Sequence, residues 1–266
     1  MKEGTTPSQE YSYFQIQSMW GVTKHFGGVR VTRQLAELCH VNRESYVLEV
    51  GCGTGFTASY MAEAIGCRIM GIDLSPGMVE WAEKRAARKN LQARCQFRVA
   101  DAQQLPFEDN TFDAMLCESV TAFVPDKRLA LSEYRRVVKP GGYVGLNEGT
   151  LVKGIPPDDF IAFIKRAMGG VDFLDPDEWR SLLEESSLTD IQVSINQINA
   201  FRQRLEEYEG MDARDWLERV KAIGSAIGMY FTNPDLRRYV NTLIPSRKVM
   251  RDLFTYLGYG LYTGRK

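Results

Sequence analysis

The sequence has few of the features that mark specialised classes of protein. Its five cysteines are odd in number and form no Cys-x-x-Cys pair, which argues against a disulfide scaffold or a zinc site and favours reduced thiols. No run approaches the roughly 20 apolar residues of a membrane-spanning helix. Residues 1–10 are polar and lack the apolar core of a signal peptide. Neither an internal repeat nor a low-complexity segment is present. We therefore expect a cytoplasmic, globular protein without a membrane span.

The sequence also has no large excess of positive or negative charge. The formal net charge of −1 provides no general field that attracts polyanions, so nucleic acid is disfavoured as a substrate. The basic cluster at residues 84–89 is interpreted as the solvated face of a helix. An apolar content of 44% is ordinary, and 266 residues suffice for one large core with additions, but not comfortably for two full domains.

A glycine-rich stretch at residues 47–56, VLEVGCGTGF, organises the chain. The apolar run predicts a buried strand, and Gly51, Gly53 and Gly55 predict a tight turn into a helix. Glycine is needed there because the backbone takes positive φ and lets a ligand lie against it. Glu49 is unusual in a buried strand. On its own this pattern fits NAD, FAD, a nucleotide or no ligand.

Acidic residues follow at the ends of later strands. Asp73 lies about 20 residues after the glycine turn, where doubly wound folds place a carboxylate for ribose hydroxyls. Asp101 belongs to a predicted third strand, Glu118 ends the fourth, and Glu148 ends the fifth at the rim of the crevice. Helical segments between the strands predict a parallel α/β sheet covered on both faces, with ligands at its carboxyl edge. The further predicted strands are 68–73, 99–107, 111–118 and 138–145.

Taken together, these motifs resemble the class I S-adenosylmethionine-dependent methyltransferases, in particular the small-molecule group around the ubiquinone/menaquinone and sterol methyltransferases. The segments that carry the resemblance are Glu49–Gly55, Gly71–Met78, Asp101–Phe107, Phe112–Glu118 and Val137–Tyr143. A dinucleotide dehydrogenase fits less well, because the Leu-Pro-Phe and Lys-Pro-Gly-Gly segments are not expected in that class of enzyme.

The resemblance implies a cofactor, S-adenosylmethionine, with S-adenosylhomocysteine as product. It implies that the three glycines lie under the methionine part of the cofactor and that Asp73 holds the ribose. Leu74 and Met78 are then expected on either side of the adenine, with Asp101 and the Ala102 backbone at its edge. Glu49 and Glu118 complete the implied cofactor set.

The resemblance also implies a Rossmann-like fold with a mostly parallel seven-stranded sheet and an antiparallel last strand. The expected organisation is an N-terminal helical lid (1–41), a core (42–199), a helical cap insertion (200–253) and a final core strand (254–266). The aromatic N-terminal segment, with Tyr11, Tyr13 and Phe14, either covers the cofactor and substrate or simply packs on the sheet.

Glu118 and His25 are the candidate catalytic residues. Methyl transfer is an in-line displacement that depends on positioning, and it needs a general base only when the nucleophile must lose a proton. Histidine has suitable chemistry near neutral pH. Alternatively, His25 is structural and Glu118 only binds the cofactor or backbone. No metal is expected, because the carboxylate–metal cluster of catechol-type enzymes cannot be assembled from these motifs.

Large apolar residues are numerous in the predicted cap and just before it. They form either a pocket for a lipophilic molecule or ordinary core between helices. We therefore predict an enzyme of the EC 2.1.1 class, a monomer or homodimer, that methylates a small and preferably lipophilic molecule. The alternatives are a protein or RNA substrate, or a non-catalytic cofactor-binding partner domain. The large apolar residues in the predicted cap and just before it are Phe160, Phe163, Met168, Phe173, Trp179, Met211, Trp216, Met229, Tyr230 and Phe231.

Overall fold

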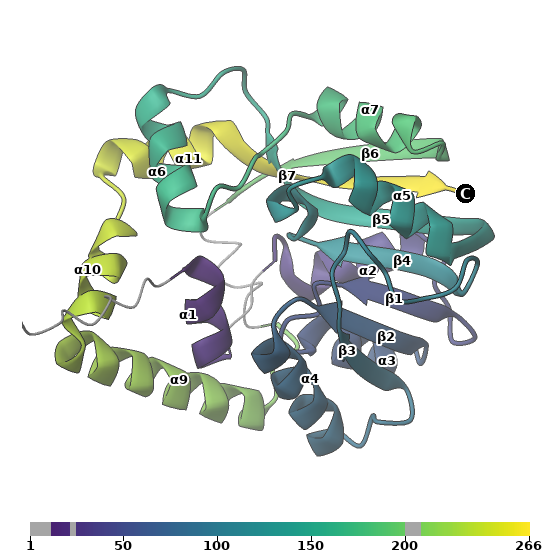
Figure 1. Ribbon diagram of the computed structural model, residues 1–266, viewed down its shortest axis with the longest axis horizontal. Coiled ribbons are helices and arrows are strands. Elements are labelled where there is room, and N and C mark those ends of the chain that lie inside the picture. Colours follow the sequence, from purple (N-terminus) through teal and green to yellow (C-terminus); the bar gives the residue numbers. More distant parts are fainter. Residues whose placement is uncertain (1–11, 22–24, 200–208) are drawn as a thin grey trace, which may run out of the picture.

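A computed structural model describes residues 12–21, 25–199 and 209–266. In this part of the chain a seven-stranded sheet has the order β3-β2-β1-β4-β5-β7-β6 (Figure 1). β7 runs antiparallel to both of its neighbours, and the other neighbouring strands are parallel. The predicted mostly parallel sheet with an antiparallel last strand is therefore confirmed. The strands are β1 (Tyr46–Val50), β2 (Arg68–Asp73), β3 (Cys95–Val99), β4 (Phe112–Glu118), β5 (Val138–Leu151), β6 (Thr189–Gln197) and β7 (Leu257–Arg265).

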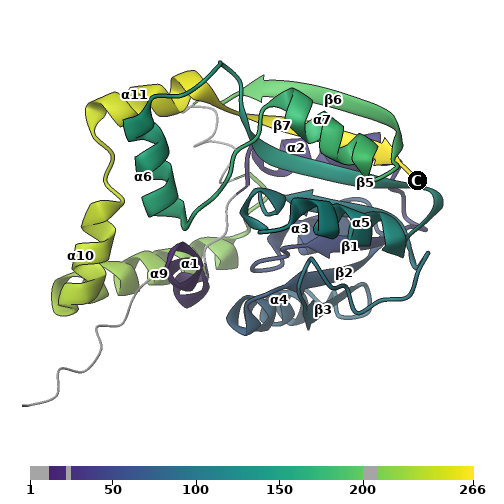
Figure 2. The same ribbon diagram turned by 45° about the horizontal axis from the view of Figure 1, so that its top comes forward.

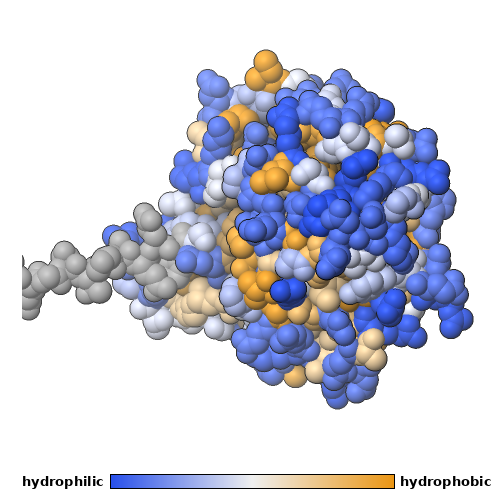
Figure 3. Space-filling model, turned by 45° about the vertical axis from the view of Figure 1, so that its right-hand side comes forward, coloured by the Kyte–Doolittle hydropathy of each residue, from blue (hydrophilic) through white to orange (hydrophobic). Residues whose placement is uncertain are grey.

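Helices cover both faces of the sheet. Successive residues of β1 supply the two apolar layers, because side chains alternate along a strand: Val47 packs in one layer and Leu48 in the other. The surface in Figure 3 is mostly hydrophilic, as the outer faces of such helices require. One layer carries α2 (Gly28–Leu38), α3 (Phe56–Ala64) and α4 (Pro76–Arg88), and the other carries α5 (Lys127–Val137) and α7 (Pro176–Glu185).

Two strand ends differ from the sequence-based predictions. The predicted third strand at 99–107 is wrong, because β3 ends at Val99. The Asp101 side chain accepts a hydrogen bond from the Gln103 N–H at 2.8 Å, and such a turn competes with strand pairing. The prediction that Glu148 ends a strand at the rim is also wrong. β5 continues to Leu151, and Glu148 is fully buried.

The remaining described helices lie together beside the sheet (Figures 1 and 2). α6 packs on α11, and α9 contacts both α1 and α10. The lid, core and cap boundaries stay predictions. Residues 200–208 of the predicted cap and Tyr11 of the predicted lid lie outside the described residues. These helices are α1 (Tyr13–Trp20), α6 (Asp158–Met168), α9 (Ala213–Thr232), α10 (Pro234–Thr242) and α11 (Arg247–Tyr256).

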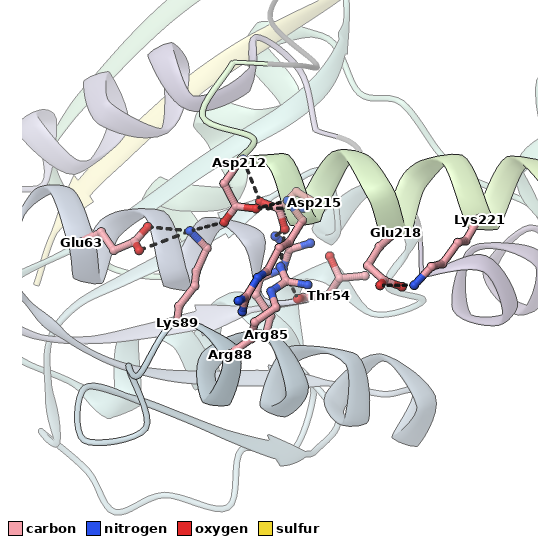
Figure 4. Close-up of polar contacts among 10 residues, drawn as sticks. Thr54, Glu63, Arg85, Arg88, Lys89, Asp212, Asp215, Glu218 and Lys221 are labelled. Atoms are coloured by element: carbon pink, nitrogen blue, oxygen red, sulfur yellow. Dashed lines mark hydrogen bonds and ion pairs between the residues drawn. The ribbon is translucent and has the colours of Figure 1, made fainter.

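A buried ion cluster attaches α9 to the core (Figure 4). Asp215, in the first turn of α9, has a side chain with no solvent exposure and pairs with Arg85 and Arg88 of α4. Arg85 also donates from Nε to the Thr54 carbonyl in the glycine turn, at 3.0 Å. The cluster therefore joins three segments that are far apart in the sequence. We call Arg85, Arg88 and Asp215 the α4–α9 cluster.

Candidate active site

A cavity of about 1700 Å³ lies at the carboxyl ends of the central strands. We call its polar side, built on β1, β2, β4 and the loops after them, the strand-end region. Every predicted site residue except Gly55 lines the cavity. A Cβ on Gly55 would lie 2.8 Å from the Ala82 Cβ, so glycine at that position allows α3 to pack on α4. The apolar region consists of Phe26, Ile164, Met168, Phe173, Leu253 and Phe254.

The glycine turn has the backbone geometry that the sequence predicts. Gly51 has a φ of 74°, and its N–H and that of Cys52 both donate to the Ile72 carbonyl at 2.8 Å. A Cβ on Gly51 would lie 2.2 Å from the Val120 Cγ2. Only glycine therefore fits between β1 and the loop after β4.

Asp73 connects the glycine turn to α4. Its carboxylate accepts hydrogen bonds from the Gly53 N–H at 3.0 Å and the Ser75 N–H at 2.9 Å. Burial raises the pKa of Asp73, although these two N–H groups lower it in part. Ser75 caps α4, and its hydroxyl accepts from the Met78 N–H.

The predicted adenine-binding residues lie around this loop. Leu74 is 71% exposed and borders the cavity, whereas Met78 is buried beneath its surface. Asp101 is exposed in the turn after β3, and Ala102 follows it along the cavity wall. The arrangement places the apolar Leu74 near polar groups on the cavity wall.

Glu49 is the most unusual of the predicted residues. It is buried, and no hydrogen-bond donor in the described part of the chain reaches its Oε2. Burial raises the pKa of Glu49 well above its ordinary value, and the like charges of Glu118 and Asp73 raise it further. Three neighbouring carboxylates with an unpartnered oxygen form an environment that a cation would stabilise.

Glu118 and His25, both predicted as catalytic, meet in the structure. His25 Nε2 lies 3.7 Å from Glu118 Oε2. The Thr32 hydroxyl lies between them, donating to Glu118 Oε1 at 2.8 Å and lying 3.2 Å from His25 Nε2. Asn147 donates from Nδ2 to Glu118 Oε2 at 3.0 Å. The pair is therefore held by residues of α2 and β5.

The sequence analysis missed Thr32 and Asn147. A signal was present for Asn147, a polar residue inside an apolar strand and opposite Glu118 in the register of β4 and β5. Thr32 gave no such signal, because a threonine in an amphipathic helix is common. Its role depends on α2 packing against β4 and β5.

Glu148 stabilises the loop after β4. Its carboxylate accepts hydrogen bonds from the N–H groups of Val120 (3.1 Å), Thr121 (2.7 Å) and Ala122 (3.3 Å). Burial raises the pKa of Glu148 to about 7, although these N–H groups lower it in part. The same loop places Phe123, in the short helix η1 (Thr121–Phe123), against the ring of Phe14 in α1.

The large apolar residues in and before the cap have several locations. Met168 and Phe173 line the cavity, whereas Phe160 and Trp179 belong to the main core. Phe231 is 71% exposed, so the interpretation of the cap residues as core between helices is wrong for this side chain. The outward face of α9, on which it lies, also exposes Leu217, Val220 and Ile227.

Two further properties concern metals and membranes. Within residues 12–21, 25–199 and 209–266, no three His, Cys, Asp or Glu side chains are grouped so that they could hold a metal ion. None of the helices described there combines the length and apolar character needed to cross a bilayer. All five cysteines are free and buried.

Residues 48–146 match a family model described as a methyltransferase domain. This range contains the glycine turn, Asp73, Asp101 and Glu118, which line the cavity. Over this range the chain is similar to methyltransferase domains, which supports the resemblance to the class I S-adenosylmethionine-dependent methyltransferases.

Several of its relatives have names that refer to small molecules. The chain is 30% identical to phosphoethanolamine N-methyltransferase 1 of Triticum aestivum over 69% of its own length, but spans only 36% of that protein. It is 29% identical to the 27-O-demethylrifamycin SV methyltransferase of Amycolatopsis mediterranei, over 65% of this chain and 69% of that protein. A solved structure of Haemonchus contortus phosphoethanolamine N-methyltransferase 2 with S-adenosyl-L-methionine shares the fold. Its TM-score is 0.71 at 21% identity, covering 97% of this chain and 58% of that chain.

Proposed function

We propose that the chain binds S-adenosylmethionine in the strand-end region and transfers its methyl group to a small lipophilic molecule in the apolar region. The observation that carries the proposal is that Glu49, Asp73 and Glu118 line the same cavity as a wall of apolar side chains. A ligand that carries an ammonium and a sulfonium would stabilise these carboxylates. An apolar acceptor would fill the remaining volume.

The residues present fit this cofactor. The orphan Oε2 of Glu49 can accept a hydrogen bond, and Asp73 retains acceptor capacity besides its two N–H partners. Gly51 and Gly53 would allow the ligand to lie against the backbone, and Leu74, Met78, Asp101 and Ala102 would contact its adenine. When bound, S-adenosylmethionine supplies a methyl group on a positively charged sulfur.

The protein would contribute positioning and proton removal. The apolar region would hold the acceptor and exclude water, which is the main requirement of an in-line displacement. For an acceptor that must lose a proton, we assign His25 as the base. Glu118 would stabilise the resulting imidazolium, and Thr32 would hold the two side chains in place.

The lining favours an acceptor without a phosphate. Among the described lining residues Arg219 is the only arginine, and there is no lysine, whereas five are acidic. Recognition of a phosphate group depends on Arg and Lys donors. The relative named for 27-O-demethylrifamycin SV therefore suggests a better analogy than those named for phosphoethanolamine. The acidic residues are Glu49, Asp73, Asp101, Glu118 and Glu148.

Labelling with methyl-tritiated S-adenosylmethionine tests the proposal. The purified protein is incubated with fractionated cell extract, with an Asp73→Ala variant as control. We expect label in an organic-soluble, low-mass fraction that depends on Asp73. Label in precipitable material would instead indicate a protein or RNA substrate. Binding of the cofactor without any label would support a non-catalytic partner domain.

A further inference from the structure

The outward side of α9 is apolar over most of its length. At about 100° per residue, Leu217, Val220, Ile223, Ile227 and Phe231 fall on one side of the helix. Each of these side chains is between 52% and 71% exposed. A surface helix of a globular protein normally turns its apolar side inward, so this arrangement is inverted. We call these five residues the α9 apolar face.

The inward side of α9 is polar in its first two turns. Asp215 is buried in the α4–α9 cluster (Figure 4), and Arg219 lines the cavity. The first turns of the helix are therefore held to the core by ion pairs, and farther along its half-buried residues include Ala222, Ala226 and Met229. The apolar face does not contribute to attaching α9 to the core, and its composition needs another explanation.

Basic residues border the α9 apolar face. On the same helical wheel Lys221 and Arg214 lie next to Leu217. The acidic Glu218 lies farther from the apolar face than these two basic residues. Residues 213–256 contain eight Lys and Arg but four Asp and Glu, a net charge of +4 in a chain whose net charge is −1. The segment that exposes this apolar face thus also carries an excess of positive charge.

This combination selects one kind of partner. A helix with an apolar side, aromatic and aliphatic residues, and bordering Lys and Arg is suited to the surface of an anionic membrane. A second copy of the chain fits less well, because two-fold pairing of the same patch would bring two segments of net charge +4 together. An anionic lipid surface complements both the charge and the apolar side chains.

We propose that the α9 apolar face and its bordering basic residues dock the protein on an anionic lipid surface. Met250 of α11 is 42% exposed and also lines the cavity, so the apolar region reaches the outside of this same group of helices. A lipophilic acceptor would enter the cavity at Met250, on α11, which lies at the other end of this group of helices from α9 (Figure 1). The docking is independent of the proposed methyl transfer, whereas the delivery of an acceptor rests on it.

Vesicle co-sedimentation of the full chain tests the docking. One set of vesicles is phosphatidylcholine alone, and in the other a quarter of the lipid is phosphatidylserine. We expect binding to the mixed vesicles that weakens at high salt. An Ile227→Ser/Phe231→Ser variant is expected to bind at least tenfold more weakly. An Arg214→Glu/Lys221→Glu variant should lose affinity for the mixed vesicles by about thirtyfold or more, given about 1 kcal/mol per basic residue.

A matched control is Leu129→Ser, which removes a side chain that is 45% exposed on α5 and should bind like the wild type. Circular dichroism and cofactor binding would verify that each variant is folded. The proposal is overturned if the wild type binds neither set of vesicles, or if the Ile227/Phe231 variant binds the mixed vesicles with the affinity of the wild type. It is equally overturned if the wild type is a dimer that these substitutions dissociate, because the face then belongs to a second copy. Methyl transfer is not needed for any of these readouts.

Discussion

Removal of the Asp215 carboxylate should detach α9 from the core. Its side chain has no solvent exposure and pairs through Oδ1 with Arg85 at 2.5 Å and with Arg88, whose side chains are only 14% and 22% exposed (Figure 4). An Asp215→Ala substitution leaves these two cations adjacent and unpaired. Burial already lowers the pKa of Arg85, and the Asp215 charge acts against this effect.

The expected loss in the free energy of unfolding follows from the geometry of the cluster. Breaking a buried ion pair by removing one partner costs about 3–5 kcal/mol, and the lower end applies here because both guanidinium groups keep some contact with water. For a chain of this size, such a loss lowers Tm by roughly 6–12 °C if unfolding is cooperative. If α9 detaches alone, the loss appears instead as faster hydrogen exchange at residues 213–232.

Guanidinium chloride unfolding combined with hydrogen exchange distinguishes these cases. The control is Glu218→Ala on the same helix, because Glu218 pairs at 3.0 Å with Lys221 where both side chains are largely exposed. Such surface pairs contribute about 0–1 kcal/mol. If the Asp215 and Glu218 variants behave alike in both measurements, the α4–α9 cluster does not attach the cap, and the reasoning is refuted.

Three further predictions concern the cavity. A Gly51→Ala substitution should abolish cofactor binding and lower Tm, because a Cβ there would lie 2.2 Å from the Val120 Cγ2; an unchanged Tm would contradict this. Asp73→Ala should weaken S-adenosylmethionine binding at least tenfold by calorimetry, and equal affinity would remove the ribose assignment. The third prediction concerns pH. The raised pKa values of Glu49 and Glu148, the latter about 7 against an ordinary 4.5, mean that ionising them costs stability in the folded state. The free energy of unfolding should therefore fall as the pH rises from about 5 to about 8, and Glu148→Gln should flatten that slope in urea titrations. A slope that Glu148→Gln leaves unchanged would show that Glu148 does not cause it.

Local chemistry made much of the site predictable from the sequence. The glycine turn needs glycine because of its positive φ and close packing, and strand ends in a parallel sheet meet at one edge. Asp73 and Glu118 therefore line one cavity, as the sequence predicts. The mostly parallel seven-stranded sheet with its antiparallel last strand followed from the resemblance to a known family and is confirmed.

The tertiary structure alone decided the rest, because it depends on contacts between residues far apart in the chain. Thr32 contacts Glu118 across 86 positions, and Asn147 contacts Glu118 across 29. The polar Asn147 inside an apolar strand was a signal, but no local pattern shows which residue either side chain contacts. Burial of Glu148 depends on how far β5 extends and on the loop that covers it. Helical periodicity showed that α9 has an apolar side, but periodicity cannot show which way a helix faces. The ion pairs of Asp215 fix the orientation of α9, because they hold one side of the helix against α4. The apolar side therefore faces outward.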